Sequence, residues 1–122
     1  MKSQDLRIGN WIYESKATQF PMQVEAIFQD GTLYLNFEGN EGDVWDCNVK
    51  DIEAIPLTNE ILLKCGFEKI GMAYIKGMFI INGRSDGRFQ LGNSGMSVEL
   101  TFLHQLQNLF YSLTGKELEV EL

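Results

Sequence analysis

The chain has 122 residues, of which 44% are apolar and 22% charged, and it carries a net charge of −7. This composition is typical of one folded domain with a buried core, and it excludes a disordered chain. No apolar run approaches the roughly 18–20 residues of a membrane span, and the first residues lack the apolar stretch of a secretory signal. We therefore predict a cytoplasmic protein with no membrane association.

Short strand patterns dominate residues 1–56. The predicted strands are Asn10–Glu14, Met22–Gln29, Thr32–Phe37, Val44–Val49 and Ile52–Ile55. Alternation in the second strand places Val24, Ala26 and Phe28 on one side. Asp30-Gly31 then predicts a hairpin turn. Five short strands joined by tight turns predict a small curled sheet or an SH3-like barrel.

The next segment carries complete signals for a short helix over Asn59–Cys65. Thr58 is the predicted N-cap, because its hydroxyl can accept a backbone N–H of the first turn. Leu57 and Leu62 are spaced for a hydrophobic staple. Gly66 fits the left-handed position that follows a helix and allows a Schellman motif. We expect this helix to link two β-rich parts.

A second β-rich stretch follows the short helix. The strand candidates are Phe67–Ile70, Ala73–Lys76, Met78–Asn82, Arg88–Leu91 and Ser97–Leu100. Glycines separate them at short intervals, which predicts an antiparallel meander.

The last predicted element is an amphipathic helix. Its apolar stripe consists of Phe102, Leu103, Leu106, Leu109, Phe110 and Leu113. Gly115 ends the pattern, and the alternation of residues 116–122 predicts a short terminal strand. The expected fold class is α+β: an N-terminal SH3-like curled sheet or barrel, a short linking helix, and a second meander with the C-terminal helix packed on it. We expect residues 1–122 to form a single compact unit with sub-parts 1–56 and 57–122.

The polar side of the predicted C-terminal helix carries no full charge. No Asp, Glu, Lys or Arg occurs between Leu100 and Gly115. The polar residues of this side are His104, Gln105, Gln107, Asn108, Tyr111 and Ser112. Because a freely solvated helix face usually holds charged residues, we predict that this side is covered as well. The cover is another part of the chain, a second subunit or a partner protein, and the candidate interaction surface is His104, Gln105, Asn108, Tyr111 and Ser112.

Charge is distributed unevenly along the chain. The segment from Glu38 to Glu53 has a net charge of −5, whereas the segment from Lys64 to Arg88 has a net charge of +3. Each segment is interpreted either as a solvated face or as a binding surface. In the second interpretation the acidic patch meets a basic partner, and a modest anion site lies near Arg84 and Arg88.

The sequence contains no pattern typical of an enzyme. His104 is the one histidine, and no nucleophile motif accompanies it. Cys47 and Cys65 form no metal-ligand spacing and are expected to be small core residues. The segment Gly83–Arg88 is a turn rather than a phosphate loop, and the acidic stretch fails the EF-hand template. We therefore expect no catalytic activity, no metal site and no cofactor.

Single-stranded nucleic acid is the alternative partner, since small β-barrels bind it through aromatic side chains and basic grooves. The alternative contacts are Trp11, Tyr13 and Tyr34 with Arg84 and Arg88. The acidic charge of the first half argues against this partner, and we expect the N-terminal aromatic side chains to form core.

Three stretches carry a family resemblance: Asp5–Ile12 (DLRIGNWI), Ile55–Phe67 (IPLTNEILLKCGF) and Leu103–Leu118 (LHQLQNLFYSLTGKEL). Together they resemble a family of short uncharacterised proteins of Bacteroides-type gut bacteria and of their prophages and mobile elements. The resemblance implies a cytoplasmic protein of phage or mobile-element context, and it implies no activity or catalytic residue. Our leading interpretation is a non-enzymatic protein-interaction module whose partner is a second copy or another protein.

Overall fold

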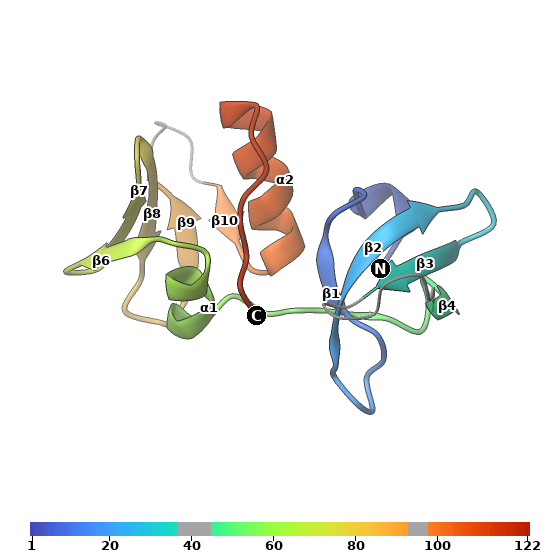
Figure 1. Ribbon diagram of the computed structural model, residues 1–122. Helices are drawn as coiled ribbons and strands as arrows, with labels where there is room; N and C mark the ends of the chain where they lie inside the picture. The colour runs from blue at the N-terminus through green and yellow to red at the C-terminus, as the bar shows by residue number, and fades with distance from the viewer. Residues whose placement is uncertain (37–44, 93–97) are drawn as a thin grey trace. The chain divides into compact units, whose positions relative to one another are not determined.

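The structure is a computed structural model that describes residues 1–36, 45–92 and 98–122 (Figure 1). The chain divides into two compact units, Met1–Ile55 (the N-terminal unit) and Pro56–Leu122 (the C-terminal unit). Each unit contains a five-stranded antiparallel sheet, and the C-terminal unit adds two helices. The predicted α+β class is confirmed, and the boundary lies one residue from the predicted joint. That the two parts form one compact unit stays a prediction.

The N-terminal unit contains a short 3-10 helix, η1, and strands β1 to β5. Their bounds are η1 Ser3–Asp5, β1 Trp11–Tyr13, β2 Pro21–Ile27, β3 Thr32–Asn36, β4 Trp45–Asn48 and β5 Glu53–Ala54. The strand order is β4-β3-β2-β1-β5, so β4 and β5 are the two edges of an open sheet. The predicted five-stranded sheet is therefore present, and it is not closed into a barrel. Residues 38–44, the first part of the acidic segment from Glu38 to Glu53, lie outside the described residues.

A β-bulge in β2 changes which side chains face the core. Val24 pairs with Leu35, the register then shifts, and Ala26 pairs with Tyr34. Because neighbouring residues of β3 point to opposite faces, Ala26 lies on the face opposite to Val24. The Phe28 ring contacts the Tyr34 ring edge-on, with centroids 4.8 Å apart, and so joins the outer face. The predicted alternation is therefore wrong beyond Val24.

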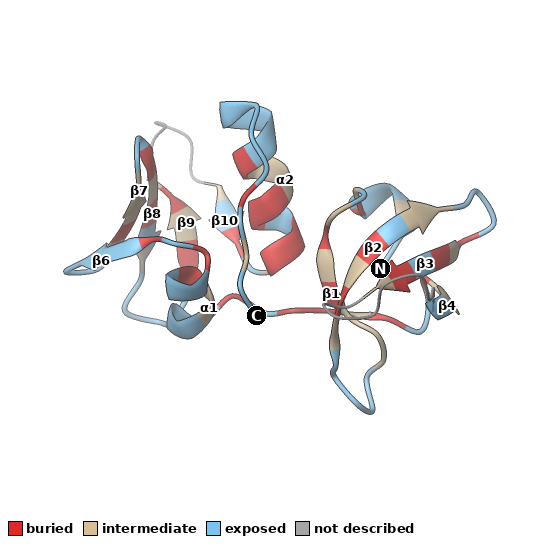
Figure 2. Ribbon diagram, in the orientation of Figure 1, coloured by how far each residue is buried: buried red, intermediate tan, exposed pale blue. Residues whose placement is uncertain are grey.

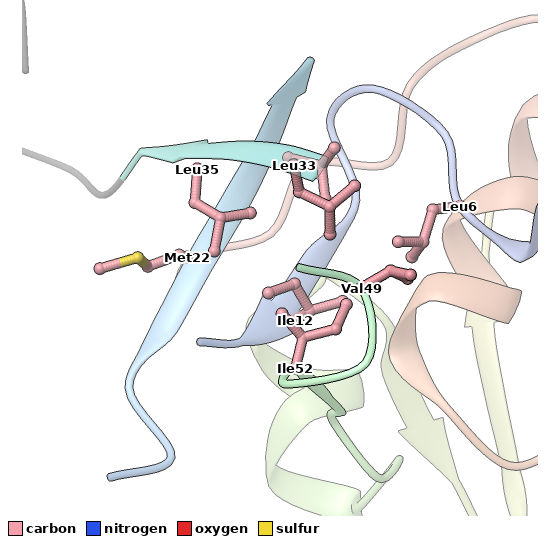
Figure 3. Close-up of a cluster of buried hydrophobic side chains, with 8 residues drawn as sticks. Leu6, Ile12, Met22, Leu33, Leu35, Val49 and Ile52 are labelled. Atoms are coloured by element: carbon pink, nitrogen blue, oxygen red, sulfur yellow. The ribbon is translucent and has the colours of Figure 1, made fainter. Parts of the chain in front are cut away.

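Among the described residues, the buried core of the N-terminal unit consists of aliphatic side chains and one methionine (Figure 3). Its buried members are Leu6, Ile12, Met22, Val24, Leu33, Leu35, Val49 and Ile52. The unit's described aromatic side chains, namely Trp11, Tyr13, Phe20, Phe28, Tyr34 and Trp45, are all partly or largely exposed. The expectation that these aromatic side chains form core is therefore wrong.

The C-terminal unit is built from α1, strands β6 to β10 and α2. Their bounds are α1 Asn59–Lys64, β6 Glu68–Ile70, β7 Ala73–Lys76, β8 Phe79–Gly83, β9 Phe89–Leu91, β10 Glu99–Leu100 and α2 Leu103–Thr114. The strand order β10-β9-β8-β7-β6 follows the chain, which confirms the meander. In the described part of the chain, neither helix is long and apolar enough to cross a membrane.

The predicted capping of α1 is confirmed at both ends. The Thr58 hydroxyl accepts a hydrogen bond from the Ile61 amide at 3.2 Å. At the other end, Gly66 adopts φ 85°, and the Phe67 amide donates to the Leu62 carbonyl at 3.3 Å. This last bond is the long-range bond of a Schellman motif, which requires the left-handed residue that Gly66 supplies.

We expect Thr58→Ala to lower the free energy of unfolding of the C-terminal unit by about 1 kcal/mol, because an amide of the first helical turn loses its acceptor. Thr58→Ser is the matched control, since serine caps as well as threonine. Urea denaturation, followed by the circular dichroism of the helices, measures both. Equal losses in the two variants would show that the methyl group, and not the hydroxyl, stabilises this site.

Helix α2 packs on the meander through part of its apolar stripe (Figure 2). Leu103, Leu106 and Phe110 are buried, and the Phe110 ring lies against the Phe79 ring with centroids 5.2 Å apart. The helix ends at Gly115, in the left-handed conformation, as predicted. Leu113 is 57% exposed, so the buried surface stops short of the predicted stripe.

The C-terminal segment after α2 is extended but forms no strand, so the predicted terminal strand is wrong. Leu118 is buried, and the Glu121 amide donates to the Lys64 carbonyl at 3.2 Å. Val120 is half-buried and Leu122 is 38% exposed, so only the first residue of the alternating pattern is buried.

Candidate functional site

The uncharged side of α2 separates into two stripes of different burial. His104 and Gln107 are buried, and Tyr111 continues their stripe at helical spacing but is exposed. Gln105, Asn108 and Ser112 form the second stripe, in which Asn108 is half-buried and the other two are exposed. The prediction that this side is covered therefore holds for the beginning of the first stripe alone. Within the candidate interaction surface, His104 is buried, whereas Gln105, Tyr111 and Ser112 are exposed. That this surface binds a partner stays a prediction.

Gln105 already has a local structural role. Its side-chain oxygen accepts hydrogen bonds from the Thr101 and Phe102 amides, each at 3.1 Å. These amides precede the first turn of α2, so Gln105 supplies the side-chain half of a capping box. Helix capping therefore explains why an uncharged glutamine stands at position 105, and no partner protein is needed to explain it.

Three of the predicted nucleic-acid contacts share one face of the N-terminal sheet. Trp11 pairs with Gln23, and Gln23 pairs with Asn36. Directly paired residues point to the same face, as do residues two apart in a strand. Trp11 and Tyr13 of β1 therefore share the outer face with Tyr34 of β3.

Phe28 belongs to the same surface, which the sequence alone did not indicate. Its ring contact with Tyr34 places it there. An alternating pattern predicts the opposite face for Phe28, because the pattern does not include the bulge in β2. We call Trp11, Tyr13, Phe28 and Tyr34 the aromatic face. Tyr34 is 38% exposed and Phe28 is 42% exposed.

Carboxylates border the aromatic face. Asp46 pairs directly with Tyr34, and Glu53 pairs directly with Tyr13. The unit as a whole has ten acidic against four basic residues. The basic residues, Lys2, Arg7, Lys16 and Lys50, all lie outside the five strands. The aromatic face is thus an apolar surface in a negative field.

The other two predicted nucleic-acid contacts lie in the C-terminal unit. Arg84 and Arg88 flank the turn between β8 and β9, as the sequence indicated. Asp86 lies between them, with an oxygen 3.5 Å from Arg84 Nη2 and 3.8 Å from Arg88 Nε. The five predicted contacts are therefore divided between two units.

Neither cysteine is activated as a nucleophile. Burial, reinforced by Asp51 and Asp46, raises the pKa of the Cys47 thiol to about 11. Burial raises the pKa of the Cys65 thiol to about 12, against an opposing effect of Lys76. Cys65 is buried and Cys47 packs at the margin of the N-terminal core, in agreement with the expected core role.

At pH 8 we expect the native Cys47 thiol to react with Ellman's reagent about a hundredfold more slowly than it does in urea, and the native Cys65 thiol about a thousandfold more slowly, because so little thiolate is present. The rate should rise about tenfold per pH unit up to the pKa of Cys47. Since the unfolded thiols ionise at a lower pH than the folded ones, their ionisation destabilises the fold above about pH 9. Fast reaction of a native thiol at pH 8 would contradict this prediction.

Across residues 1–36, 45–92 and 98–122, no three His, Cys, Asp or Glu side chains lie close enough together to hold a metal ion. No protein-family model, curated protein or solved structure matches this chain. The chemistry of the surface therefore carries the functional argument.

Proposed function

We propose that the chain is a non-enzymatic protein-interaction module that binds a basic segment of its partner on the aromatic face. The observation that carries this proposal is the reversal of the usual arrangement in the N-terminal unit, where aliphatic side chains form the core and the described aromatic side chains lie outside it. Large aromatic side chains are stabilised by burial, so a surface that gathers them is suited to a partner.

The chemistry of the aromatic face favours cations. Aromatic rings attract Lys and Arg side chains through cation–π interactions worth about 0.5–2 kcal/mol each. Asp46 beside Tyr34 and Glu53 beside Tyr13 add charge-assisted pairing at the same positions. The field of the acidic unit also accelerates encounter with a basic partner.

Nucleic acid remains the competing partner because three of its predicted contacts share the aromatic face. Stacking of bases on Trp11, Tyr13 and Tyr34 would be favourable by itself. Phosphates, however, would approach a unit that carries a net charge of −6. The charge therefore supports a basic protein segment over a polyanion. The family resemblance suggests a host or phage protein as the source of that segment.

The test is fluorescence anisotropy with a labelled short peptide of alternating Arg and Gly, a matched peptide of Glu and Gly, and a short oligothymidylate. We expect the arginine peptide to bind, with affinity that falls as salt rises. Tyr34→Ala should weaken binding about tenfold, through loss of the cation–π contact. Replacing Asp46 and Glu53 with Asn and Gln should flatten the salt dependence.

Trp45→Ala is the matched control. Trp45 is an exposed aromatic side chain of the same unit, but it pairs with the buried Leu35 and so faces the other side of the sheet. Its loss should leave binding unchanged. If the oligothymidylate binds more tightly than the arginine peptide, the nucleic-acid alternative replaces the proposal. If Tyr34→Ala left the affinity for the arginine peptide unchanged, the aromatic face would not be the binding surface, and the proposal would be contradicted.

A further inference from the structure

A pocket of about 390 Å³ opens in the C-terminal unit, between the start of α1 and the turns of the meander. Its apolar lining includes Leu57, Tyr74 and Phe89, all of which are buried residues. The Tyr74 and Phe89 rings meet edge-on with centroids 5.7 Å apart, and the Tyr74 hydroxyl donates to Asn59 Oδ1 at 2.6 Å. The pocket therefore has a preorganised apolar floor.

Three cations from different elements surround this floor. Lys69 comes from β6, Arg84 follows β8, and Arg88 precedes β9. The Lys69 ammonium lies 5.7 Å from the centre of the Tyr74 ring. No carboxylate occurs among the described residues that line the pocket. A concave site with an apolar floor and convergent positive charge is suited to an organic anion.

The turn between β8 and β9 holds the two arginines in place. The Arg84 amide donates to the Arg88 carbonyl at 2.8 Å, and the Gly87 amide donates to the Arg84 carbonyl at 3.0 Å. Asp86 accepts from the Arg88 amide at 3.0 Å while it lies near both guanidinium groups. The backbone is therefore a turn, as predicted, and any anion binding there depends on the side chains.

The existing ion pairs leave the guanidinium groups available. The nitrogen–oxygen distances are 3.5 and 3.8 Å to Asp86, and 3.7 Å from Arg88 to Glu99, with all these side chains substantially exposed. Exposed pairs of this length contribute little free energy. A phosphate can offer each arginine a shorter, bidentate pair.

We propose that this pocket binds the phosphate monoester of a small organic molecule, with the phosphate at Arg84 and Arg88 and the organic group on the Tyr74–Phe89 floor. Lys69 of β6 supplies the third positive charge. This site is separate from the aromatic face in residues, unit and ligand charge, so it goes beyond the proposed function. Either proposal can fail without the other.

The experiment is a titration of the isotope-labelled full chain with phenyl phosphate, inorganic phosphate and phenol, followed by amide chemical shifts. We expect phenyl phosphate to bind most tightly and to shift the amides of the β8–β9 turn. Replacing Arg84 and Arg88 with Gln should weaken its binding by about tenfold for each arginine removed. Lys116→Gln, a basic residue outside this pocket, should leave the affinity unchanged.

The amide spectra of the ligand-free arginine variants show whether these substitutions disturb the turn. If they do, Lys69→Gln is an independent variant, because Lys69 lies outside the turn. We expect it to weaken phenyl phosphate binding while leaving the turn intact. Equal affinity for phenyl phosphate and inorganic phosphate would overturn the proposal, because the floor would then contribute nothing. Tighter binding of a short oligothymidylate at the same amides, or absence of any arginine-dependent shift, would also overturn it.

Discussion

Leu33→Ala is expected to lower the free energy of unfolding of the N-terminal unit by about 2–5 kcal/mol, a large part of the stability of a small unit. Leu33 is fully buried in the aliphatic core, so its truncation leaves a cavity. Both tryptophans of the chain, Trp11 and Trp45, lie in this unit. Their fluorescence during urea denaturation therefore reports on this unit selectively.

Ile8→Ala is the control for that experiment. Ile8 is an aliphatic residue of the same unit, but it is 60% exposed. We expect a change within about 0.5 kcal/mol, as for most surface substitutions. Equal effects at Leu33 and Ile8 would contradict the assignment of the core, and with it the argument that the aromatic side chains lie outside.

Phe110→Ala should lower the free energy of unfolding of the C-terminal unit by about 3–5 kcal/mol. The substitution removes the ring that packs on Phe79 and that the Lys76 ammonium approaches to 6.0 Å from the ring centre. Because both tryptophans lie elsewhere, the measurement is hydrogen exchange of amides in α2 and β8. We expect the slowest of these amides to exchange faster by a factor that matches the lost stability.

Leu113→Ala is the matched control within the same helix. Leu113 belongs to the apolar stripe of the sequence but is exposed. We expect little change in exchange, since few contacts are lost. If Leu113→Ala proved as damaging as Phe110→Ala, the buried surface of α2 would extend along the whole predicted stripe, contrary to the structure.

The proposed sites lie in different units and attract opposite charges. The aromatic face combines exposed rings with carboxylates, whereas the pocket of the C-terminal unit combines a buried apolar floor with Lys69, Arg84 and Arg88. A basic peptide and a small phosphate should therefore bind independently. Each proposal is tested by substitutions in its own unit.

Features that depend on near neighbours in the chain could be predicted from the amino-acid sequence. The caps of α1, with Thr58 before it and Gly66 after it, require interactions within a few residues, and both were predictable. The meander followed from glycine-separated strand patterns, and the end of α2 followed from Gly115. These signals are local because backbone conformation and capping hydrogen bonds are decided within one turn of chain.

Which side chains face the core, and which residues contact each other, could not be predicted, because both depend on packing between separate elements. The bulge in β2 reverses the outward face after Val24, and no alternating pattern can reveal it because the shift depends on pairing with β3. The same pairing brings Phe28 to Tyr34 and leaves an aliphatic core beneath them. The burial of His104 and the convergence of Lys69 with Arg84 likewise depend on packing between elements that are distant in the chain. Aromatic residues can be buried or form a binding face with equal local propensity, so their placement is decided by long-range packing alone.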